Sequence, residues 1–357
     1  MNPPFRADHI GSLLRPKKLR EAFRGPAAAL CAAQDEAIRD VVKLQEDCGL
    51  QVVNDGEFRR ISYWEKFVRL TQGLVVKEAV FRFHDAHGHE SEFTAPYAAG
   101  KVSRREPIAL DEYQFISGIS KATGKVTLPA PSTMHFYRFT DWGSAYDDAA
   151  EFFRDLGKVY QAEIADLAAA GCKYVQIDEV AVAILCDPAA REKVQAQGGD
   201  PDQLVDLYID AINEAVKHRP ADMAIGVHIC RGNYKGMYLS EGGYDSVAEK
   251  FFGRTRASHF LLEFDTPRAG GFAPLRFVPK DKGVVLGLVS SKTPALEDLD
   301  MLRKRVDEAA GFAALDRLAI SPQCGFASTM GGNPVTEADQ RAKLRLCVDA
   351  ARAIWSK

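Results

Sequence analysis

Hydrophobic positions along the chain form two kinds of segment, short apolar runs and longer amphipathic stretches. In the longer stretches apolar residues recur about every 3.6 residues, and this spacing predicts helices. These patterns occupy 28–48, 149–170, 201–216, 245–254, 295–310 and 336–354, and Gly171 is expected to stop the second of them. The short runs are rich in β-branched residues and predict strands. They lie at 7–12, 51–55, 125–130, 173–178, 223–229, 259–264, 284–289 and 317–321.

Eight strands that alternate with helices are typical of the α/β class and of a (β/α)8 TIM barrel. One region departs from this alternation, because residues 74–122 have the pattern of a β-hairpin followed by an extra helix near 108–120. We therefore predict a single catalytic barrel over residues 1–357, with 74–122 inserted after the second strand.

Composition and charge exclude several classes of protein. The 46 Lys and Arg residues nearly balance 49 Asp and Glu residues, and no basic run is long enough to follow a phosphate backbone, so nucleic acid is not an expected partner. The N-terminus lacks the apolar core of a signal peptide, and no stretch of about 18 apolar residues predicts a membrane span. We expect a cytoplasmic protein whose seven scattered cysteines are reduced.

Polar residues at the ends of the predicted strands are the first candidates for chemistry, because the reactive groups of such barrels gather at the C-terminal ends of the strands. The candidates are Ser12, Asp55 with Glu57, Ser132, Asp178 with Glu179, His228 with Cys230, Glu263 with Asp265, Ser290 with Lys292, and Cys324.

The strongest of these candidates is a metal site. His228 and Cys230 are two residues apart on an extended segment and therefore point to the same side. Cys324 can add a second thiolate from across the barrel mouth, and Glu263 can add a carboxylate. Two sulfurs, one nitrogen and one replaceable oxygen suit Zn²⁺, which turns a bound thiol into a thiolate nucleophile. The alternative is that both cysteines are buried core residues and that the histidine is hydrogen-bonded in the core.

Two acids, Glu57 and Asp178, end their predicted strands at the same mouth. Such a pair can bind an α-ammonium group or perform acid–base chemistry. Acids at junctions between strands and helices also serve as helix caps or as solvated loop charges.

Several other polar and aromatic residues invite a functional reading that the sequence does not favour. Gly88 and the flanking acids indicate that His84, His87 and His89 belong to a solvated hairpin tip rather than to a metal site. Lys292 can bind an anion, but a loop lysine is the simpler interpretation, and the aromatic residues 135–137 can stack on a flat ligand or serve as packing.

Five motifs occur in an order that carries a family resemblance. They are Asp8-His9-Ile10-Gly11-Ser12, Asn54-Asp55-Gly56-Glu57, Val175-Gln176-Ile177-Asp178-Glu179, His228-Ile229-Cys230 and Ser321-Pro322-Gln323-Cys324-Gly325. With them, residues 6–345 resemble the catalytic barrel of cobalamin-independent methionine synthase, the 5-methyltetrahydropteroyltriglutamate–homocysteine methyltransferase.

The resemblance implies a (β/α)8 barrel in which zinc activates homocysteine for methyl transfer. It implies that the zinc ligands are His228, Cys230, Glu263 and Cys324, and that the substrate thiol competes with Glu263.

The same resemblance implies a site for the amino-acid end of homocysteine. Ile10, Gly11 and Ser12 would hold the carboxylate of homocysteine, and Glu57 and Asp178 would hold its ammonium group.

Three departures from the family bear on the methyl donor. Ser12 lies too near the start for a second, folate-binding barrel to precede it, residues 288–292 lack the family's proton-donating histidine, and residues 131–135 lack its pterin-stacking tryptophan. We therefore assign no catalytic residue beyond the zinc site and expect an activated donor, such as a methylcorrinoid or a sulfonium, to react faster than methylfolate. His9 or His135 is the alternative source of the proton.

Three functions follow from these observations. The first is a zinc-dependent methyltransferase that makes methionine from homocysteine, and Glu57 and Asp178 favour it. The second is zinc-dependent alkylation of another small thiol, as in relatives that add coenzyme M to an epoxide. The third is a non-catalytic barrel that binds a metabolite.

Overall fold

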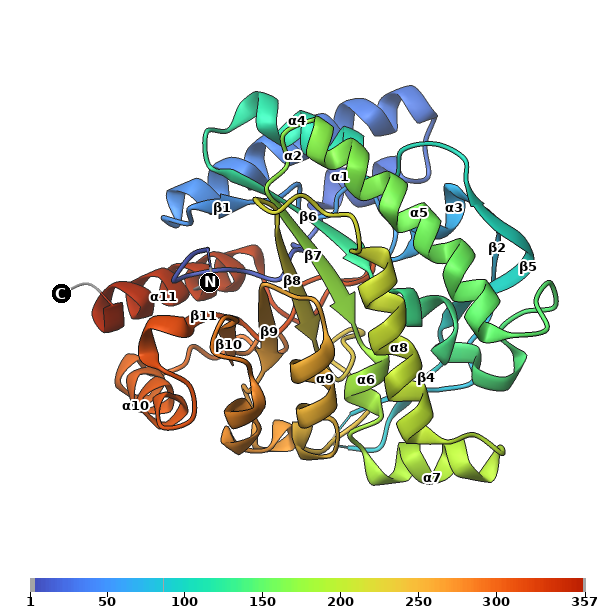
Figure 1. Cartoon of the computed structure of the whole chain (residues 1–357). Helices are drawn as coiled ribbons and strands as arrows, with labels where there is room; N and C mark the ends of the chain where they lie inside the picture. The colour runs from blue at the N-terminus through green and yellow to red at the C-terminus, as the bar shows by residue number, and fades with distance from the viewer. Residues whose placement is uncertain (1–3, 86, 356–357) are drawn as a thin grey trace.

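The computed structural model describes residues 4–85 and 87–355, and a curved parallel sheet forms its centre (Figure 1). Seven strands pair side by side in the order in which they occur along the chain. They are β1 (Val52–Val53), β6 (Thr123–Pro129), β7 (Tyr174–Glu179), β8 (Ala224–Ile229), β9 (His259–Glu263), β10 (Gly283–Val289) and β11 (Leu318–Pro322). All seven coincide with predicted strands, which confirms the α/β barrel architecture.

The predicted strand at 7–12 lies beside β11 but forms only one bridge, between Ala7 and Ile320. The N–H of Asp8 donates to the Ile320 carbonyl over 2.9 Å. On the other side, the N–H of Leu13 donates to the Gly56 carbonyl over 3.1 Å, just beyond β1. The segment therefore lies between β11 and β1, where an eighth strand would close the barrel, but most of its backbone makes no regular strand pairing.

Helices surround the sheet, and the six predicted ones are present with shifted ends (Figure 1). Asp148 caps the helix α5 (Ala149–Ala169) by accepting the Ala150 N–H, and Gly171 follows its end with φ +94°. The short α1, α3, α6 and α7 were not predicted. The helices are α1 (Lys17–Ala22), α2 (Ala27–Asp47), α3 (Glu65–Arg69), α4 (Leu110–Ile119), α5 (Ala149–Ala169), α6 (Ala181–Ile184), α7 (Pro188–Ala196), α8 (Pro201–Ala215), α9 (Ala248–Arg254), α10 (Leu299–Ala310) and α11 (Glu337–Trp355).

Short 3-10 helices lie in the loops and are named η1 (Pro131–Met134), η2 (Phe136–Asp141), η3 (Tyr244–Ser246), η4 (Pro267–Ala269), η5 (Ala273–Phe277) and η6 (Leu315–Arg317). None of the described helices is both long enough and apolar enough to cross a bilayer.

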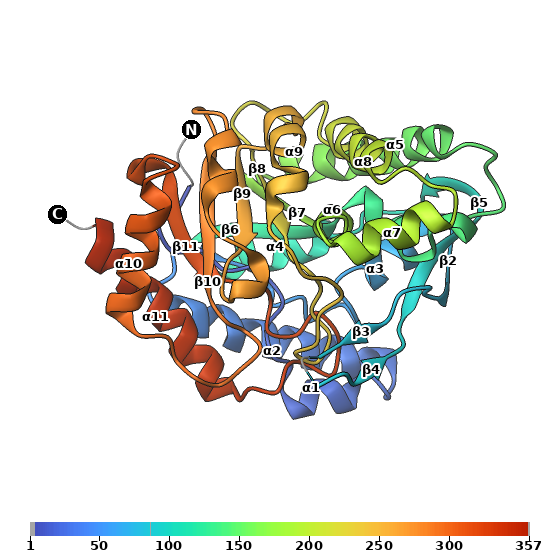
Figure 2. The ribbon, with the colours of Figure 1, turned by 90° about the horizontal axis from the view of Figure 1, so that it is seen from below.

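The insertion after the second predicted strand is a pair of antiparallel ribbons followed by a helix. β2 (Thr71–Glu78) pairs with β5 (Thr94–Arg104), and β3 (Phe83–His84) pairs with β4 (Glu90–Ser91). The β2–β5 ribbon lies on the side of the molecule away from α10 and α11 (Figure 2). The helix, α4, packs on β6 and beside α2 and α5, so it also completes the ring of helices. His84 forms an antiparallel bridge with Tyr238, so the insertion reaches the loop after β8.

Alternation along the strands separates two apolar clusters. Leu261, Val285 and Ala319 are register partners and pack with Ile10 inside the barrel. Their chain neighbours belong to the larger cluster that packs under the helices. Asp178 and His228 stand in the same register row as Leu261 and therefore point into the barrel. The row that contains Leu261 therefore also contains Asp178 and His228, two polar residues of the candidate site.

Candidate metal centre and amino-acid site

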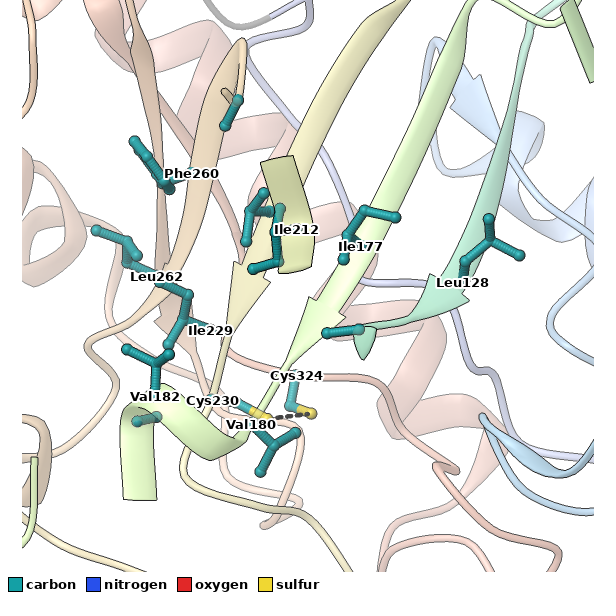
Figure 3. Close-up of a cluster of buried hydrophobic side chains, with 14 of the residues drawn as sticks. Leu128, Ile177, Val180, Val182, Ile212, Ile229, Cys230, Phe260, Leu262 and Cys324 are labelled. Carbon is teal, nitrogen blue, oxygen red and sulfur yellow. Dashed lines mark hydrogen bonds between the residues drawn. The ribbon is translucent and has the colours of Figure 1, made fainter. Parts of the chain in front are cut away.

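Three of the four predicted metal ligands converge at the C-terminal ends of the strands. His228 lies near the end of β8, Cys230 follows that strand, and Cys324 follows β11. Their ligand atoms lie within 4.8 Å of one another, and all three side chains are buried. Figure 3 shows the two sulfurs facing each other just past the strand ends. We call His228, Cys230 and Cys324 the metal triad.

The triad has the geometry that a tetrahedral metal ion requires. The two Sγ atoms are 3.7 Å apart, and two thiolates at about 2.3 Å from a tetrahedral Zn²⁺ would be separated by about 3.8 Å. His228 Nδ1 lies 3.2 Å from the Leu261 carbonyl, so this nitrogen carries the proton. His228 Nε2 is buried without a hydrogen-bond partner among the described residues. Burial lowers the pKa of His228, but the neighbouring Cys324 sulfur outweighs this effect and the pKa is raised overall. When the ring is neutral with its proton on Nδ1, Nε2 is the nitrogen that can bind a metal ion.

The two thiols share their protons unequally. The contact with Cys324 raises the pKa of Cys230, and burial raises it further. The same contact lowers the pKa of Cys324, and His228 and Lys292 lower it further against the effect of burial. Cys324 is therefore the sulfur that loses its proton more readily.

The fourth predicted ligand, Glu263, ends β9 but is not among the converging groups. Its carboxylate accepts the Arg231 backbone N–H and an Arg268 N–H, each over 2.7 Å. Burial alone would raise its pKa, but the charges of Lys292, Arg231 and Arg268 lower it to about 2. Glu263 is therefore a charged carboxylate whose oxygens are held by these two arginines.

An inner cavity, partly open to solvent, is lined both by the metal triad and by residues of the predicted amino-acid site. Four of the five predicted amino-acid ligands line it, whereas Gly11 and Glu263 do not. The lining residues are Ile10, Ser12, Glu57, Tyr63, Phe83, Tyr137, Asp178, Val180, His228, Cys230, Gly232, Asn233, Cys324, Gly325 and Ser328.

Glu57 is held in an unusual backbone conformation at this cavity. Its φ is +62°, a strained value for a residue that is not glycine, and such strain is often found at functional sites. Thr127 Oγ1 donates to Glu57 Oε1 over 2.8 Å, and Arg15 Nη2 donates to the Glu57 carbonyl over 2.9 Å. The other carboxylate oxygen, Oε2, is buried without a partner among the described residues. It is therefore free to accept a hydrogen bond from a ligand.

Asp178 is the second acid of the cavity, and Gln176 Nε2 donates to its Oδ1 over 2.7 Å. Burial raises the pKa of Asp178 to about 7; the negative charge of Glu57 adds to this rise, and His228 opposes it. A cation between Glu57 and Asp178 would reduce the electrostatic repulsion between these two acids.

The segment at 10–12 offers unpaired backbone donors. Neither the N–H of Gly11 nor that of Ser12 donates to a described residue. Gly11 has φ +144°, and a Cβ there would lie 2.7 Å from Thr127 Cγ2, so this position requires glycine. A Cβ on Gly325 would lie 1.9 Å from Ser12 Oγ, so that glycine lets Ser12 approach the loop that carries Cys324.

The structure resolves the residues whose role the sequence left open. Lys292 is buried and donates to the Gly232 carbonyl over 2.9 Å, so it is not a solvated loop lysine. His9 and His135 line neither this cavity nor the next one, and burial lowers the pKa of each to about 3. Both histidines are neutral near pH 7 and lie outside the site.

The hairpin histidines are not gathered into a metal site. His89 pairs with Asp85 over 2.7 Å, and His87 is exposed. Within residues 4–85 and 87–355, the metal triad is the group of metal-binding side chains that converges.

A second, outer cavity adjoins the inner one, and the sequence did not reveal it. It is also partly open to solvent, and it shares Tyr63, Phe83, Tyr137, Asn233 and Ser328 with the inner cavity. The hydroxyls of Tyr63 and Tyr137 lie 3.0 Å apart at this shared wall. Trp64 and Phe93 add further aromatic surface. These residues come from loops and from the insertion, where strand patterns give no signal.

Comparison with known proteins identifies the family to which the chain belongs. Residues 15–353 match the family described as the catalytic domain of cobalamin-independent synthase. The chain is 41% identical to the uncharacterized Bacillus subtilis protein YxjH, over 99% of this chain and 95% of that protein. It is 28% identical to a methionine synthase of Pyrococcus abyssi, over 88% of this chain and 82% of that protein.

A solved structure extends the likeness to the fold. The crystal structure of a Listeria monocytogenes protein provisionally assigned as a vitamin-B12 independent methionine synthase is 30% identical. It covers all of both chains with a TM-score of 0.78.

Proposed function

Because the chain belongs to the family of the cobalamin-independent synthase catalytic domain, we propose that it is a zinc-dependent methyltransferase that converts homocysteine to methionine. The observation that supports the proposal is the inner cavity, whose lining includes the metal triad together with Ser12, Glu57 and Asp178. A thiol and an amino-acid end are the two parts of homocysteine.

The metal triad is proposed to hold one Zn²⁺, with Glu263 as the exchangeable fourth ligand. A bound zinc ion would supply the means to keep the substrate sulfur deprotonated near neutral pH. A carboxylate oxygen has two lone pairs, so Glu263 could act as a ligand while it keeps the hydrogen bonds from Arg231 and Arg268.

The amino-acid end of the substrate is proposed to bind between two groups of residues. The free N–H groups of Gly11 and Ser12 would donate to its carboxylate. Glu57 Oε2 and the free oxygen of Asp178 would accept from its ammonium group, which relieves the repulsion between these acids. These contacts orient the thiol toward the metal triad.

The outer cavity is proposed to take the methyl donor, because its wall is shared with the inner cavity. The homocysteine sulfur forms the new bond to the methyl carbon while the bond between that carbon and the donor breaks, and the bonding electrons leave with the donor. Burial raises the pKa of Tyr63 and Tyr137, so both hydroxyls stay neutral and are poor acids. These two hydroxyls therefore favour a donor whose leaving group needs no proton.

Calorimetric titration of the zinc-loaded protein tests this proposal. Homocysteine should bind with release of about one proton near pH 7, measured in buffers of different ionisation enthalpy, because its thiol enters the site as thiolate. Coenzyme M, which has a sulfonate and no ammonium group, should bind at least about tenfold more weakly. Equal or tighter binding of coenzyme M would instead favour alkylation of another thiol.

A further inference from the structure

We infer that Gln176 is a positioning residue that fixes the two halves of the amino-acid site relative to each other. The inference rests on the proposed function, since it concerns how that site distinguishes an amino-acid thiol from a plain thiol.

The Gln176 side chain contacts both halves of the site at once. It is fully buried in β7 and points into the barrel two residues before Asp178. Its Nε2 donates to the Ile10 carbonyl over 2.6 Å and to Asp178 Oδ1 over 2.7 Å. Ile10 begins the segment proposed to bind the carboxylate, and Asp178 is one of the two acids proposed to bind the ammonium group.

Lys125 fixes the direction of this amide. Its Nζ donates to Gln176 Oε1 over 3.0 Å and to Asp8 Oδ1 over 2.8 Å, and it is completely buried. An ammonium group cannot accept a hydrogen bond, so Oε1 must face Lys125 and Nε2 must face the site. If the amide were flipped, Oε1 would face the Ile10 carbonyl and Asp178, and neither of them could donate a hydrogen bond to it.

This arrangement determines which atoms remain for a ligand. With Asp178 Oδ1 occupied by Gln176, Oδ2 is the oxygen left to accept from an ammonium group. The Ile10 carbonyl points at Gln176, and in a trans peptide the following N–H points the opposite way, so the Gly11 N–H is turned away from Gln176. One side chain thus sets the direction of an acceptor and of a donor.

Because Gln176 contacts both halves of the site, we expect it to affect selectivity between an amino-acid thiol and a simple thiol. A ligand with an ammonium group and a carboxylate on one carbon needs both partners at a fixed separation, whereas a simple thiol needs neither. Loss of Gln176 should therefore weaken amino-acid binding while leaving the binding of a simple thiol at the metal triad unchanged.

Two variants test this inference on the zinc-loaded protein. Gln176→Leu removes both donors, and Gln176→Glu keeps the length and the contact with Lys125 but places an acceptor against Ile10 and Asp178. For both, the Kd of homocysteine and of L-methionine should rise about ten- to a hundredfold. The Kd of 2-mercaptoethanol should stay within about twofold, and the zinc content should be that of the wild type.

Gln161→Leu is the matched control. Gln161 also makes two side-chain hydrogen bonds, to the Glu214 carbonyl over 2.8 Å and to Glu214 Oε1 over 3.0 Å, but it joins two outer helices. This variant should bind all three ligands as the wild type does.

The outcomes separate this inference from the proposed function. A wild type that binds neither homocysteine nor methionine would overturn both. A wild type that binds them, with Gln176→Leu and Gln176→Glu binding equally well, would overturn the positioning role alone. Equal weakening of homocysteine and 2-mercaptoethanol in the folded Gln176→Glu variant would show a general structural role and would also overturn it.

Discussion

The Sγ atoms of Cys230 and Cys324 lie 3.7 Å apart, although 94 residues separate them along the chain. They follow β8 and β11, which are not neighbours in the sheet, because β9 and β10 lie between them. Curvature of the sheet brings the two strand ends together, as Figure 3 shows for the sulfurs. The pair therefore depends on the closed barrel rather than on local sequence.

Substitution of one thiol should remove the metal without unfolding the chain. Cys324→Ser is expected to lower the zinc content from about one per chain to near zero, because a neutral hydroxyl is a poor zinc ligand. Cys230 and Cys324 belong to the large apolar cluster, but serine is close to cysteine in size, so the far-ultraviolet circular dichroism should not change. Elemental analysis of the native protein and the variant measures this.

Two controls accompany that measurement. Cys31→Ser changes an exposed thiol far from the site, and His87→Gln with His89→Gln changes the hairpin tip. Both should keep full zinc content. Loss of zinc in the histidine variants but not in Cys324→Ser would move the metal site to the insertion.

Removal of one acid should weaken the binding of the amino acid and leave the metal in place. Asp178→Asn is expected to raise the Kd of homocysteine about tenfold or more, because a charged partner of the ammonium group is lost. Calorimetry measures the Kd, and Asp307→Asn, an exposed change on α10, is the control. Normal homocysteine binding by Asp178→Asn would refute the ammonium-binding role.

Acid should destabilise the protein through buried neutral histidines. Burial lowers the pKa of His135 to about 3, from 6.5 in an unfolded chain. As the pH falls, the histidine therefore takes up a proton in the unfolded state before it does so in the folded state. The contribution of this histidine to the free energy of unfolding is complete above pH 6.5 and is lost as the pH falls toward 3. At pH 5 the free energy of unfolding should be about 2 kcal/mol lower than at neutral pH because of this histidine alone. His9 and His259, whose pKa burial lowers to about 3 and 4, act in the same direction.

Thermal melting between pH 7.5 and 5 measures this dependence. His135→Phe keeps a ring of similar shape but cannot take up a proton, so its melting temperature should fall less steeply with acid than that of the wild type. His218→Gln, an exposed substitution, should leave the slope unchanged. A slope that does not change in His135→Phe would contradict the assignment.

The methyl donor should be an activated one. Demethylation of a tertiary amine such as methylfolate needs a proton on the leaving nitrogen, and the hydroxyls of Tyr63 and Tyr137, at the wall shared by the two cavities, are poor acids. A methylcorrinoid or a sulfonium should therefore be consumed faster than methylfolate when the donors are compared at equal concentration. Turnover of methylfolate at about 1 s⁻¹ or more would contradict this.

Much of this account could be predicted from the sequence, because its signals are local. Continuous apolar runs such as the one at β10 mark buried parallel strands, and polar residues at their ends mark the barrel mouth. The spacing of His228 and Cys230 gave two ligands of the metal triad directly. By contrast, the segment at 7–12 has strand-like residues but pairs through one bridge, and at Gly11 its backbone has a positive φ that favours glycine.

The remaining features depend on contacts between distant parts of the chain. Tyr63 and Tyr137 meet only because the loops after β1 and β6 fold over the same cavity. The sequence around Lys292 is typical of a loop lysine. Its burial depends on a distant residue, because its ammonium group donates to the Gly232 carbonyl across the barrel mouth. The arginine contacts of Glu263 likewise come from two separate loops, so spacing could not reveal them.

Formation of methionine tests the proposed methyl transfer without intermediate assumptions. The zinc-loaded protein is incubated with homocysteine and either methylcobalamin, S-methylmethionine or methylfolate, and methionine is measured by mass spectrometry. The account predicts methionine from at least one activated donor, its loss in Cys324→Ser, and its loss when zinc is removed and recovery when zinc is restored. No methionine from any of the three donors, or equal formation by the zinc-free protein, would contradict it.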